Sequence, residues 1–471
     1  MKSNLFLFIT LGFCCIVISC SKETNIPADT AKEISSFTIK KSDGSPFEPA
    51  DISVTIRNDS ILISLPPLTD FSNLIPEFTI EAKSVSPASG IRQNFNSPVV
   101  YTVTADNGST KQYKACASFS KPINTVYVGG YDNTFYALDA INGSLKWSYH
   151  GGAAFVYSSP TYKDGVVYVG GIDNYVYAFN AVNGKVLWKT ALCSTGIESD
   201  AVVSDSTVYV GTNDDEMIAL DARTGTVRWR YPTGANVSSS PKIFNGVVYF
   251  GSSDGAFYAL KAQTGQLLWK YQTGAMINQS GASLVNGVLY VGSRDNYLYA
   301  INAQNGTLVW RYNTGVSLEQ SSPTVVNGIV YIGGWYNVPG FNIKGSVYAV
   351  VASTGTLVWE KLTNTGFSTS PFVTNNRLFI CGDDGNISAL DATTGTTLWQ
   401  KTILANSASP AEVNGIVYVG GGGTRFFYAL DAITGGEKWR FPMPNSLMIS
   451  SPLIISDNSE PNYSGDSGAL D

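Results

Sequence analysis

The chain has 471 residues, enough for two or three ordinary domains or for one large repeat array beside a small domain. Charged residues make up 14% and aromatic residues 12%, a composition that excludes a disordered chain and indicates an aromatic-rich, well-packed protein. The formal net charge of −6 provides no basic surface, so we expect no nucleic-acid partner.

The N-terminus carries the one long apolar run, from Leu5 to Ser19, after a single positive residue, Lys2. The run is too short for a membrane span and predicts a signal peptide over residues 1–19. It ends in Val-Ile-Ser-Cys20, which resembles the lipobox of bacterial lipoproteins. The resemblance implies that Cys20 becomes the mature first residue and carries acyl chains that hold the protein on the membrane. The alternative is ordinary cleavage beside an incidental cysteine.

Residues 20–32 are polar and without periodicity, and they predict a lipidated tether. Three cysteines remain after Cys20, namely Cys116, Cys193 and Cys381. Their odd number and unrelated positions predict small buried side chains and no disulfide framework.

Residues 33–119 alternate apolar and polar side chains in short runs separated by turn residues such as Asp43-Gly44 and Asn107-Gly108. Six or seven short strands in this length predict a small β-sandwich. The end of the segment, Tyr101 to Lys114, resembles the immunoglobulin-like modules of Bacteroidetes surface lipoproteins. That resemblance implies a spacer; a ligand site on the sandwich is the alternative.

From residue 124 onward an alanine, a glycine three residues later and a tryptophan seven residues later recur eight times. The tryptophans are Trp147, Trp188, Trp229, Trp269, Trp310, Trp359, Trp399 and Trp439. Their spacing is 40 or 41 residues except for one step of 49, and such a fixed period indicates a repeat architecture. Each unit contains four strand-like runs joined by Asn-Gly, Asp-Gly or Thr-Gly turns, the pattern of a β-propeller blade.

The strand count predicts how the ring closes. The array starts near Asn124 with a second, a third and a fourth strand, and it ends at Ser450 to Ile455 with a lone first strand. We therefore expect an all-β, eight-bladed propeller over residues 124–456 whose last strand completes the first blade, followed by a polar tail over 457–471. The glycine of the motif should form the tight turn, and the tryptophan should dock on the neighbouring blade, above a small alanine, with its indole N–H on a backbone carbonyl.

These repeats resemble the pyrroloquinoline-quinone-type propeller repeats, in which Ala-x-x-x-Thr-Gly-x-x-x-Trp or a close variant is the docking motif. The family includes quinone- and Ca²⁺-dependent dehydrogenases and the non-enzymatic propeller lipoprotein of the outer-membrane β-barrel assembly machinery. The dehydrogenase alternative is disfavoured here. The only adjacent cysteines, Cys14 and Cys15, lie in the signal peptide, no haem attachment motif occurs, and the only histidine is His150.

The sequence gives little support for a metal site or for catalysis by carboxylates. The acidic turns, such as Asp132-Asn133 and Asp173-Asn174, occupy equivalent positions in different repeats, so they predict turn formers and no metal site. A catalytic set among Glu198, Asp200 and Glu319 is the weaker alternative, because different blades contribute these residues. We expect no catalytic residue and no cofactor.

Candidate binding residues lie where the repeat is interrupted. The 49-residue step inserts about nine residues, which carry Trp335, Tyr336 and Phe341 around a Pro339-Gly340 tip. An exposed aromatic loop can bind sugar rings or a partner protein; the alternative is that the loop folds onto its own blade and buries Trp335. Further residues are expected at the rim of the central channel: Tyr157, Glu198, Gln279, Glu319 and Gln320.

Three functions are compatible with this pattern. The first is a monomeric, non-enzymatic scaffold, lipid-anchored to the outer membrane on its periplasmic face or on the cell surface, whose partner is an envelope protein. The second is a surface lipoprotein that binds a glycan or another ligand through the aromatic loop 335–345. The third and weakest is a quinone-dependent oxidoreductase.

Overall fold

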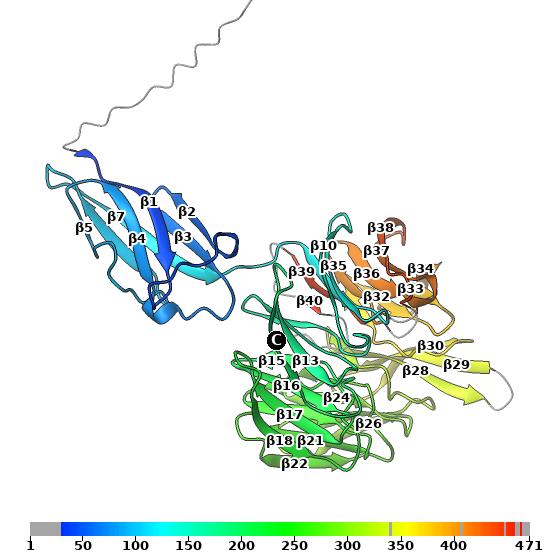
Figure 1. Cartoon of the computed structure of the whole chain (residues 1–471). Coiled ribbons are helices and arrows are strands. Elements are labelled where there is room, and N and C mark those ends of the chain that lie inside the picture. The colour runs from blue at the N-terminus through cyan, green and yellow to red at the C-terminus, as the bar shows by residue number, and fades with distance from the viewer. Residues whose placement is uncertain (1–29, 339–341, 406–407, 447–448, 457–461, 464–471) are drawn as a thin grey trace, which may run out of the picture. The chain divides into compact units, whose positions relative to one another are not determined.

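The computed structural model describes residues 30–338, 342–405, 408–446, 449–456 and 462–463. The chain divides into two compact units (Figure 1). The first comprises residues up to Leu65 and Asp70–Ser118, and the second comprises Pro66–Thr69 and Phe119 onward. Cys20 lies outside the described residues, and no helix within them is long and apolar enough to cross a bilayer.

The first unit contains seven strands in two sheets: β1 (Glu33–Lys40) pairs with β4 (Ile75–Glu81), and a second sheet has the order β2-β3-β7-β6-β5. The strands of this second sheet are β2 (Ser53–Arg57), β3 (Ser60–Leu65), β5 (Ser84–Ser86), β6 (Val99–Thr104) and β7 (Thr110–Phe119). Two short 3-10 helices, η2 (Pro49–Asp51) and η3 (Phe71–Asn73), lie in the connections. Alternate residues of β3, Ile61, Ile63 and Leu65, are fully buried and join Phe37 of β1 in one core, so both sheets share an apolar interior.

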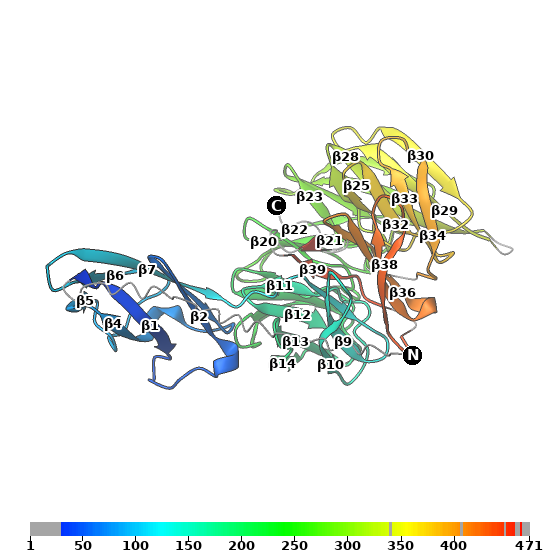
Figure 2. The same cartoon turned by 90° about the horizontal axis from the view of Figure 1, so that it is seen from above.

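The second unit contains a series of antiparallel sheets, which we number in chain order from one to eight. In sheets two to eight the four strands lie in chain order, as β11 to β14 show in Figure 2. Sheet one comprises β8 (Thr125–Gly129), β9 (Thr134–Asp139), β10 (Leu145–His150), β39 (Leu453–Ile455) and β40 (Asn462–Tyr463). Sheet two comprises β11 (Thr161–Lys163), β12 (Val166–Gly170), β13 (Tyr175–Asn180) and β14 (Val186–Ala191).

The next three sheets have the same four-stranded order. Sheet three comprises β15 (Val202–Ser204), β16 (Thr207–Thr212), β17 (Glu216–Asp221) and β18 (Val227–Pro232). Sheet four comprises β19 (Lys242–Phe244), β20 (Val247–Gly251), β21 (Ala256–Lys261) and β22 (Leu267–Gln272). Sheet five comprises β23 (Ser283–Val285), β24 (Val288–Gly292), β25 (Tyr297–Asn302) and β26 (Leu308–Asn313).

The last three sheets continue the series. Sheet six comprises β27 (Thr324–Val326), β28 (Ile329–Val338), β29 (Asn342–Val351) and β30 (Leu357–Thr363). Sheet seven comprises β31 (Phe372–Thr374), β32 (Arg377–Cys381), β33 (Asn386–Asp391) and β34 (Thr397–Thr402). Sheet eight comprises β35 (Ala411–Val413), β36 (Ile416–Gly421), β37 (Phe426–Asp431) and β38 (Glu437–Pro442), with the 3-10 helix η4 (Gly422–Thr424) between β36 and β37.

The sheets pack face to face around a common centre. First strands of neighbouring sheets contact one another, as β11 and β15 do, and fully buried apolar residues fill the space between adjacent sheets. At the two ends of the series, β39 pairs with β8, with Ile454 opposite Val126. The predicted all-β class is therefore confirmed, and the second unit has a propeller-like fold.

The insertion in the 49-residue step has a different form from the one expected. The sequence suggests a loop, whereas residues on both sides of the tip lengthen β28 and β29 to ten residues each, with Trp335 opposite Gly345. The hairpin extends past the other strands of sheet six (Figure 1). Phe341 lies outside the described residues.

Candidate functional site

The repeat motif builds the joints between sheets. All eight motif tryptophans donate their indole N–H to the carbonyl of the motif alanine in the next sheet, at 2.9–3.1 Å. Trp439 of sheet eight donates to Ala140 of sheet one, so the joints continue across the chain ends. An indole N–H buried without a partner would be costly, and the alanine carbonyl provides that partner eight times.

The indole ring lies over the motif glycine of the next sheet, in addition to its bond to the motif alanine. A Cβ on Gly184 would lie 2.6 Å from ring carbons of Trp147, and the same close approach recurs at Gly306 under Trp269. These glycines also have φ of +73° and +72°, a left-handed conformation that disfavours other residues.

A tyrosine on the second strand of six sheets shares the same acceptor. Its hydroxyl donates to the motif alanine carbonyl of the next sheet at 2.7–3.2 Å, as Tyr127 does to Ala181. In sheet seven Phe379 occupies this position and provides no hydroxyl.

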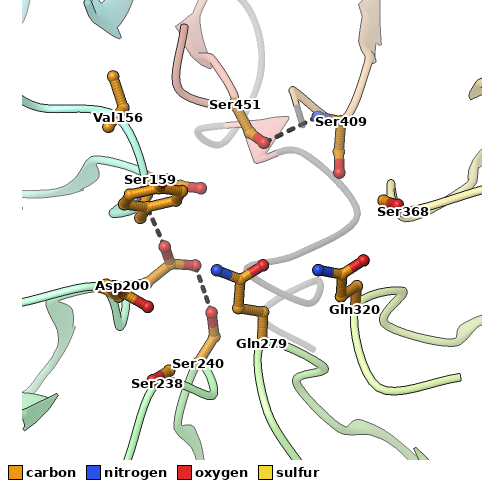
Figure 3. A pocket seen from close by; sticks show the side chains of 12 residues that line it. Val156, Ser159, Asp200, Ser238, Ser240, Gln279, Gln320, Ser368, Ser409 and Ser451 are labelled. Atoms are coloured by element: carbon orange, nitrogen blue, oxygen red, sulfur yellow. Dashed lines mark hydrogen bonds between the residues drawn. The ribbon is translucent and has the colours of Figure 1, made fainter. Parts of the chain in front are cut away.

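Four of the predicted rim residues lie together at the central channel. Tyr157, Glu198, Gln279 and Gln320 line one cavity with Asp200 and a set of serines (Figure 3). The side-chain amides of Gln279 and Gln320 point into the cavity. Burial, with a smaller effect of Glu198, raises the pKa of the Tyr157 hydroxyl, so this group stays protonated at neutral pH. Glu319, the fifth predicted residue, does not line the cavity.

Serine side chains around the cavity connect neighbouring first strands. Ser322 N–H donates to Ser370, Ser370 to Ser409 and Ser409 to Ser451, each at 2.8–2.9 Å. Asp200 occupies the equivalent position in sheet three. Its carboxylate accepts the Ser159 N–H at 2.5 Å and the Ser240 hydroxyl at 2.7 Å, and the residue is 1% exposed (Figure 3). These bonds hold first strands together, so Asp200 has a structural role in the ring.

The acidic turns also serve the fold. Asp132, Asp254 and Asp295 each accept a backbone N–H two residues later, which fixes the turn. Each also accepts the hydroxyl of a tyrosine four residues later at 2.6–2.7 Å. Within the described ranges, no group of three or more His, Cys, Asp or Glu side chains is arranged to hold a metal ion.

Trp335 lies at the base of the extended hairpin and is half-buried. Its backbone pairs with that of Ser317, through N–H to carbonyl bonds of 2.8 and 3.0 Å, so the two side chains lie on one face. Tyr336 is half-buried and packs on the apolar core between sheets five and six. The base of the hairpin is therefore half-buried, and Tyr336 packs at the junction of sheets five and six.

Three polar atoms near this hairpin are buried and have no hydrogen-bond partner among the described residues: Trp335 Nε1, Ser317 Oγ and Glu319 Oε2. Glu319 is 5% exposed, and its other carboxylate oxygen is 3.7 Å from the Arg294 guanidinium. Val316 and Leu318 face Gly334 on the opposite side, because a Cβ on Gly334 would lie 2.5 Å and 2.8 Å from their side chains. The alternation of an extended chain then directs Ser317 and Glu319 to the side of Trp335.

The three remaining cysteines are free, as predicted. Cys381 is buried, and its burial raises the pKa of the thiol, whereas Cys116 and Cys193 are only half-buried.

These features define a class: an all-β repeat protein with a propeller-like ring of sheets joined by tryptophan docking. A family model described as outer membrane protein assembly factor BamB matches residues 117–196, 173–338 and 317–446. The chain belongs to this family. A second model, described as SGBP, N-terminal, matches residues 34–116, and a search of curated proteins finds no match.

Solved structures with the same fold fall into two groups. BamB from Moraxella catarrhalis is 19% identical over 64% of this chain and 92% of its own length, with a TM-score of 0.53. A quinohemoprotein alcohol dehydrogenase, ADHIIG from Pseudomonas putida HK5, is 18% identical over 67% of this chain and 69% of its own, with a TM-score of 0.53. A europium-containing methanol dehydrogenase is 17% identical over 63% and 80%, with a TM-score of 0.55. At these identities the likeness concerns the fold.

Proposed function

We propose that the chain is a non-enzymatic envelope protein whose propeller is a scaffold that binds other proteins. The observation that carries this proposal is the uniformity of the joints between sheets, in a chain that belongs to the family described as outer membrane protein assembly factor BamB. The motif tryptophans, the turn aspartates and Asp200 all have structural partners. The residues without such a structural role lie at the half-buried channel rim and in the extended hairpin.

In this proposal the eight sheets act as eight blades of a closed, monomeric propeller, and the first unit is an immunoglobulin-like spacer between the membrane and the ring. Acyl chains on Cys20 would hold the protein on the outer membrane, on either its periplasmic face or the cell surface. Each buried methylene of such chains adds about 0.8 kcal/mol to membrane binding.

The channel residues do not fit a quinone and Ca²⁺. Calcium takes six to eight oxygen ligands, whereas both carboxylate oxygens of Asp200 already accept bonds from Ser159 and Ser240. The cavity lining is mainly serine hydroxyls and glutamine amides, with Tyr157 as its aromatic residue, so it offers no pair of apolar surfaces to enclose a flat ring system. These features support a propeller that uses no cofactor.

Co-purification tests the scaffold. The full chain, carrying an affinity tag, is recovered from detergent-solubilised envelopes and compared with a variant in which residues 335–344 are replaced by an Asn-Gly turn like those elsewhere in the repeats. We expect defined envelope proteins to accompany the native chain and at least one to be lost from the variant. Recovery of the bare monomer in both cases would contradict the proposal.

A second candidate function, binding of a glycan or another hydroxyl-rich ligand, is favoured by the polar atoms at the hairpin. Trp335 Nε1 is a donor, Glu319 Oε2 is an acceptor and Ser317 Oγ can act as either, and none of the three has a partner in the part of the chain that the structure describes. Sugar hydroxyls can satisfy such groups while the sugar ring stacks on the indole.

A glycan array with the native chain and Trp335→Ala tests this candidate. We expect binding that falls at least tenfold in the variant, with Trp269→Phe as a control for damage to the fold. The absence of binding, or binding indifferent to Trp335, would exclude it.

A further inference from the structure

The joints between sheets contain a second repeated feature, an aromatic pair. A tyrosine on the third strand packs against an aromatic residue on the outer strand of the preceding sheet, with ring centroids 5.6–6.3 Å apart. The pairs are Tyr136 with Phe441, Tyr177 with Tyr149, Tyr258 with Tyr231, Tyr299 with Tyr271 and Tyr348 with Tyr312.

The third-strand tyrosine has a fixed polar partner. In four sheets its hydroxyl donates to the turn aspartate four residues earlier, at 2.6–2.7 Å, as Tyr258 does to Asp254. The repeat therefore places a phenol ring between two sheets and a carboxylate at its hydroxyl end.

Between sheets six and seven both aromatic residues are missing. The outer-strand position is Lys361, and the third-strand position is the small residue Ser388. Sheets two and three also lack the pair, but there the fully buried Ile218 occupies the tyrosine position. The replacement by Ser388 instead leaves a cavity of about 260 Å³.

The cavity keeps the surroundings of a phenol ring. Its apolar wall contains Phe367, Ile380 and Leu390, all buried, and its polar rim contains Lys361, Asp384 and Ser388. Asp384 is the turn aspartate four residues before Ser388, and its carboxylate is exposed. Its bonds in the described part of the chain are to Asn386, at 2.7 and 3.1 Å. The acceptor that elsewhere binds a tyrosine hydroxyl thus faces a cavity.

We propose that this cavity binds the 4-hydroxyphenyl ring of a tyrosine side chain presented by a partner protein; the identification of the partner as a protein rests on the scaffold function proposed above. The ring occupies the space of the missing tyrosine, contacts Phe367, Ile380 and Leu390, and donates its hydroxyl to Asp384. The cavity is large enough, because a buried apolar cavity of about 150 Å³ binds benzene. Hydroxyl-to-carboxylate hydrogen bonds are among the stronger ones in proteins, which favours tyrosine over phenylalanine.

The ring-binding step is tested on the purified full chain with p-cresol as the probe, titrated by NMR or calorimetry beside toluene. We expect p-cresol to bind with a millimolar Kd and more tightly than toluene. Ser388→Tyr fills the cavity with the repeat's own residue and should weaken binding at least tenfold while leaving the Tm equal or higher. Ser144→Tyr, the same change at an exposed turn, should leave binding unchanged.

Two further variants keep the test decisive. Lys361→Tyr fills the cavity from the other side if Ser388→Tyr lowers the Tm, and Asp384→Asn should reduce the preference for p-cresol over toluene about fivefold. Failure of the native chain to bind p-cresol, or equal binding by the native chain and both filled variants, would overturn the proposal.

The partner is tested by repeating the envelope co-purification with Ser388→Tyr and Ser144→Tyr. Loss of a partner from the first and its retention by the second supports the tyrosine site. Retention of every partner by both variants overturns the site and leaves the scaffold function standing. If no partner is recovered even with the native chain, the scaffold function is contradicted. The proposal that a partner protein presents the tyrosine ring then fails as well.

Discussion

At the residue scale, the alanine carbonyl is an acceptor for two donors in six of the eight joints, the motif tryptophan and a second-strand tyrosine. Both donors belong to the preceding sheet, as Tyr127 and Trp147 do for Ala181, and their rings pack against each other. In sheet seven Phe379 provides no hydroxyl, and the carbonyl of Ala432 accepts the bond from Trp399.

Phe379→Tyr should therefore strengthen the joint between sheets seven and eight. The added hydroxyl can donate to Ala432, and a hydrogen bond of this kind contributes about 0.5–1.5 kcal/mol. Urea unfolding followed by circular dichroism measures the change. Tyr290→Phe, which removes the equivalent hydroxyl from Ala352, should lower stability by a similar amount. A loss of stability in Phe379→Tyr would show that sheet seven cannot accommodate the oxygen.

Glu319 makes stability depend on pH in a predictable direction. Burial raises the pKa of its carboxyl, and Arg294 offsets only part of the rise. The folded state thus favours the protonated form, and the stability that this provides is present at low pH. It is lost as pH rises from the unfolded pKa of about 4.3 through the folded value. Glu319→Gln should remove that loss, so its stability relative to the native chain should increase between pH 4 and pH 7.

Glu33 provides a control of opposite sign. Burial alone would raise the pKa of its carboxyl, but hydrogen bonds from Lys111 and Tyr113 outweigh this effect and lower it. The stabilisation of the folded state by the Glu33 carboxylate is present above the pKa of the unfolded chain and is lost as the pH falls through the pKa of the folded state. Glu33→Gln should therefore cost the first unit more stability at pH 7 than at pH 3, as thermal melts at the two pH values can show.

At the element scale, the eight motif tryptophans differ from the ninth. Trp269 bonds Ala303, packs over Gly306 and holds two sheets together, so Trp269→Ala should destabilise the second unit by about 3–5 kcal/mol. Trp335 is bonded through its backbone to Ser317, in the connection between sheets five and six, and an alanine retains these bonds, so Trp335→Ala should cost about 1 kcal/mol or less. Denaturant unfolding followed by circular dichroism compares them. Equal losses would mean that Trp335 also joins two sheets.

The hairpin shows what the sequence pattern could and could not provide. The repeat break located the insertion, but its strands were missed, although Pro339-Gly340 between alternating residues is compatible with a hairpin tip. A loop was expected because the usual turn at this point is short. The pairing of Trp335 with Ser317 could not be predicted, because Ser317 belongs to a connection without a repeat pattern.

At the scale of the whole molecule, the joining of β39 to β8 makes the ring depend on residues near both ends of the unit. A chain ending at Pro442 lacks β39 and leaves Val126 and its neighbours in β8 as an unpaired edge. Such an edge promotes aggregation. We expect a lower Tm and concentration-dependent aggregation by light scattering, whereas a chain ending at Ser456 keeps β39 and should behave as the native one. Similar behaviour of both truncations would show that the closing strand is dispensable.

The fold was largely predictable because one motif recurs at a fixed period and each copy makes the same contacts. The grouping of Tyr157, Glu198, Gln279 and Gln320 also followed, since a ring brings equivalent positions to one centre. The cavity beside Ser388 was not foreseen. It arises from a tyrosine replaced within an otherwise regular strand, which becomes visible only when the third strands are aligned and their neighbours are known.

The position of β39 has a consequence for biogenesis. Sheet one begins near residue 125 but cannot be completed until residue 455 has left the ribosome and, if the chain is exported, the translocation channel. Until then β8 is paired with β9 on one edge only. A nonsense or frameshift mutation between β8 and β39 therefore leaves an unpaired strand edge, which proteases and chaperones can recognise. Only a chain synthesised through residue 455 can pair β39 with β8.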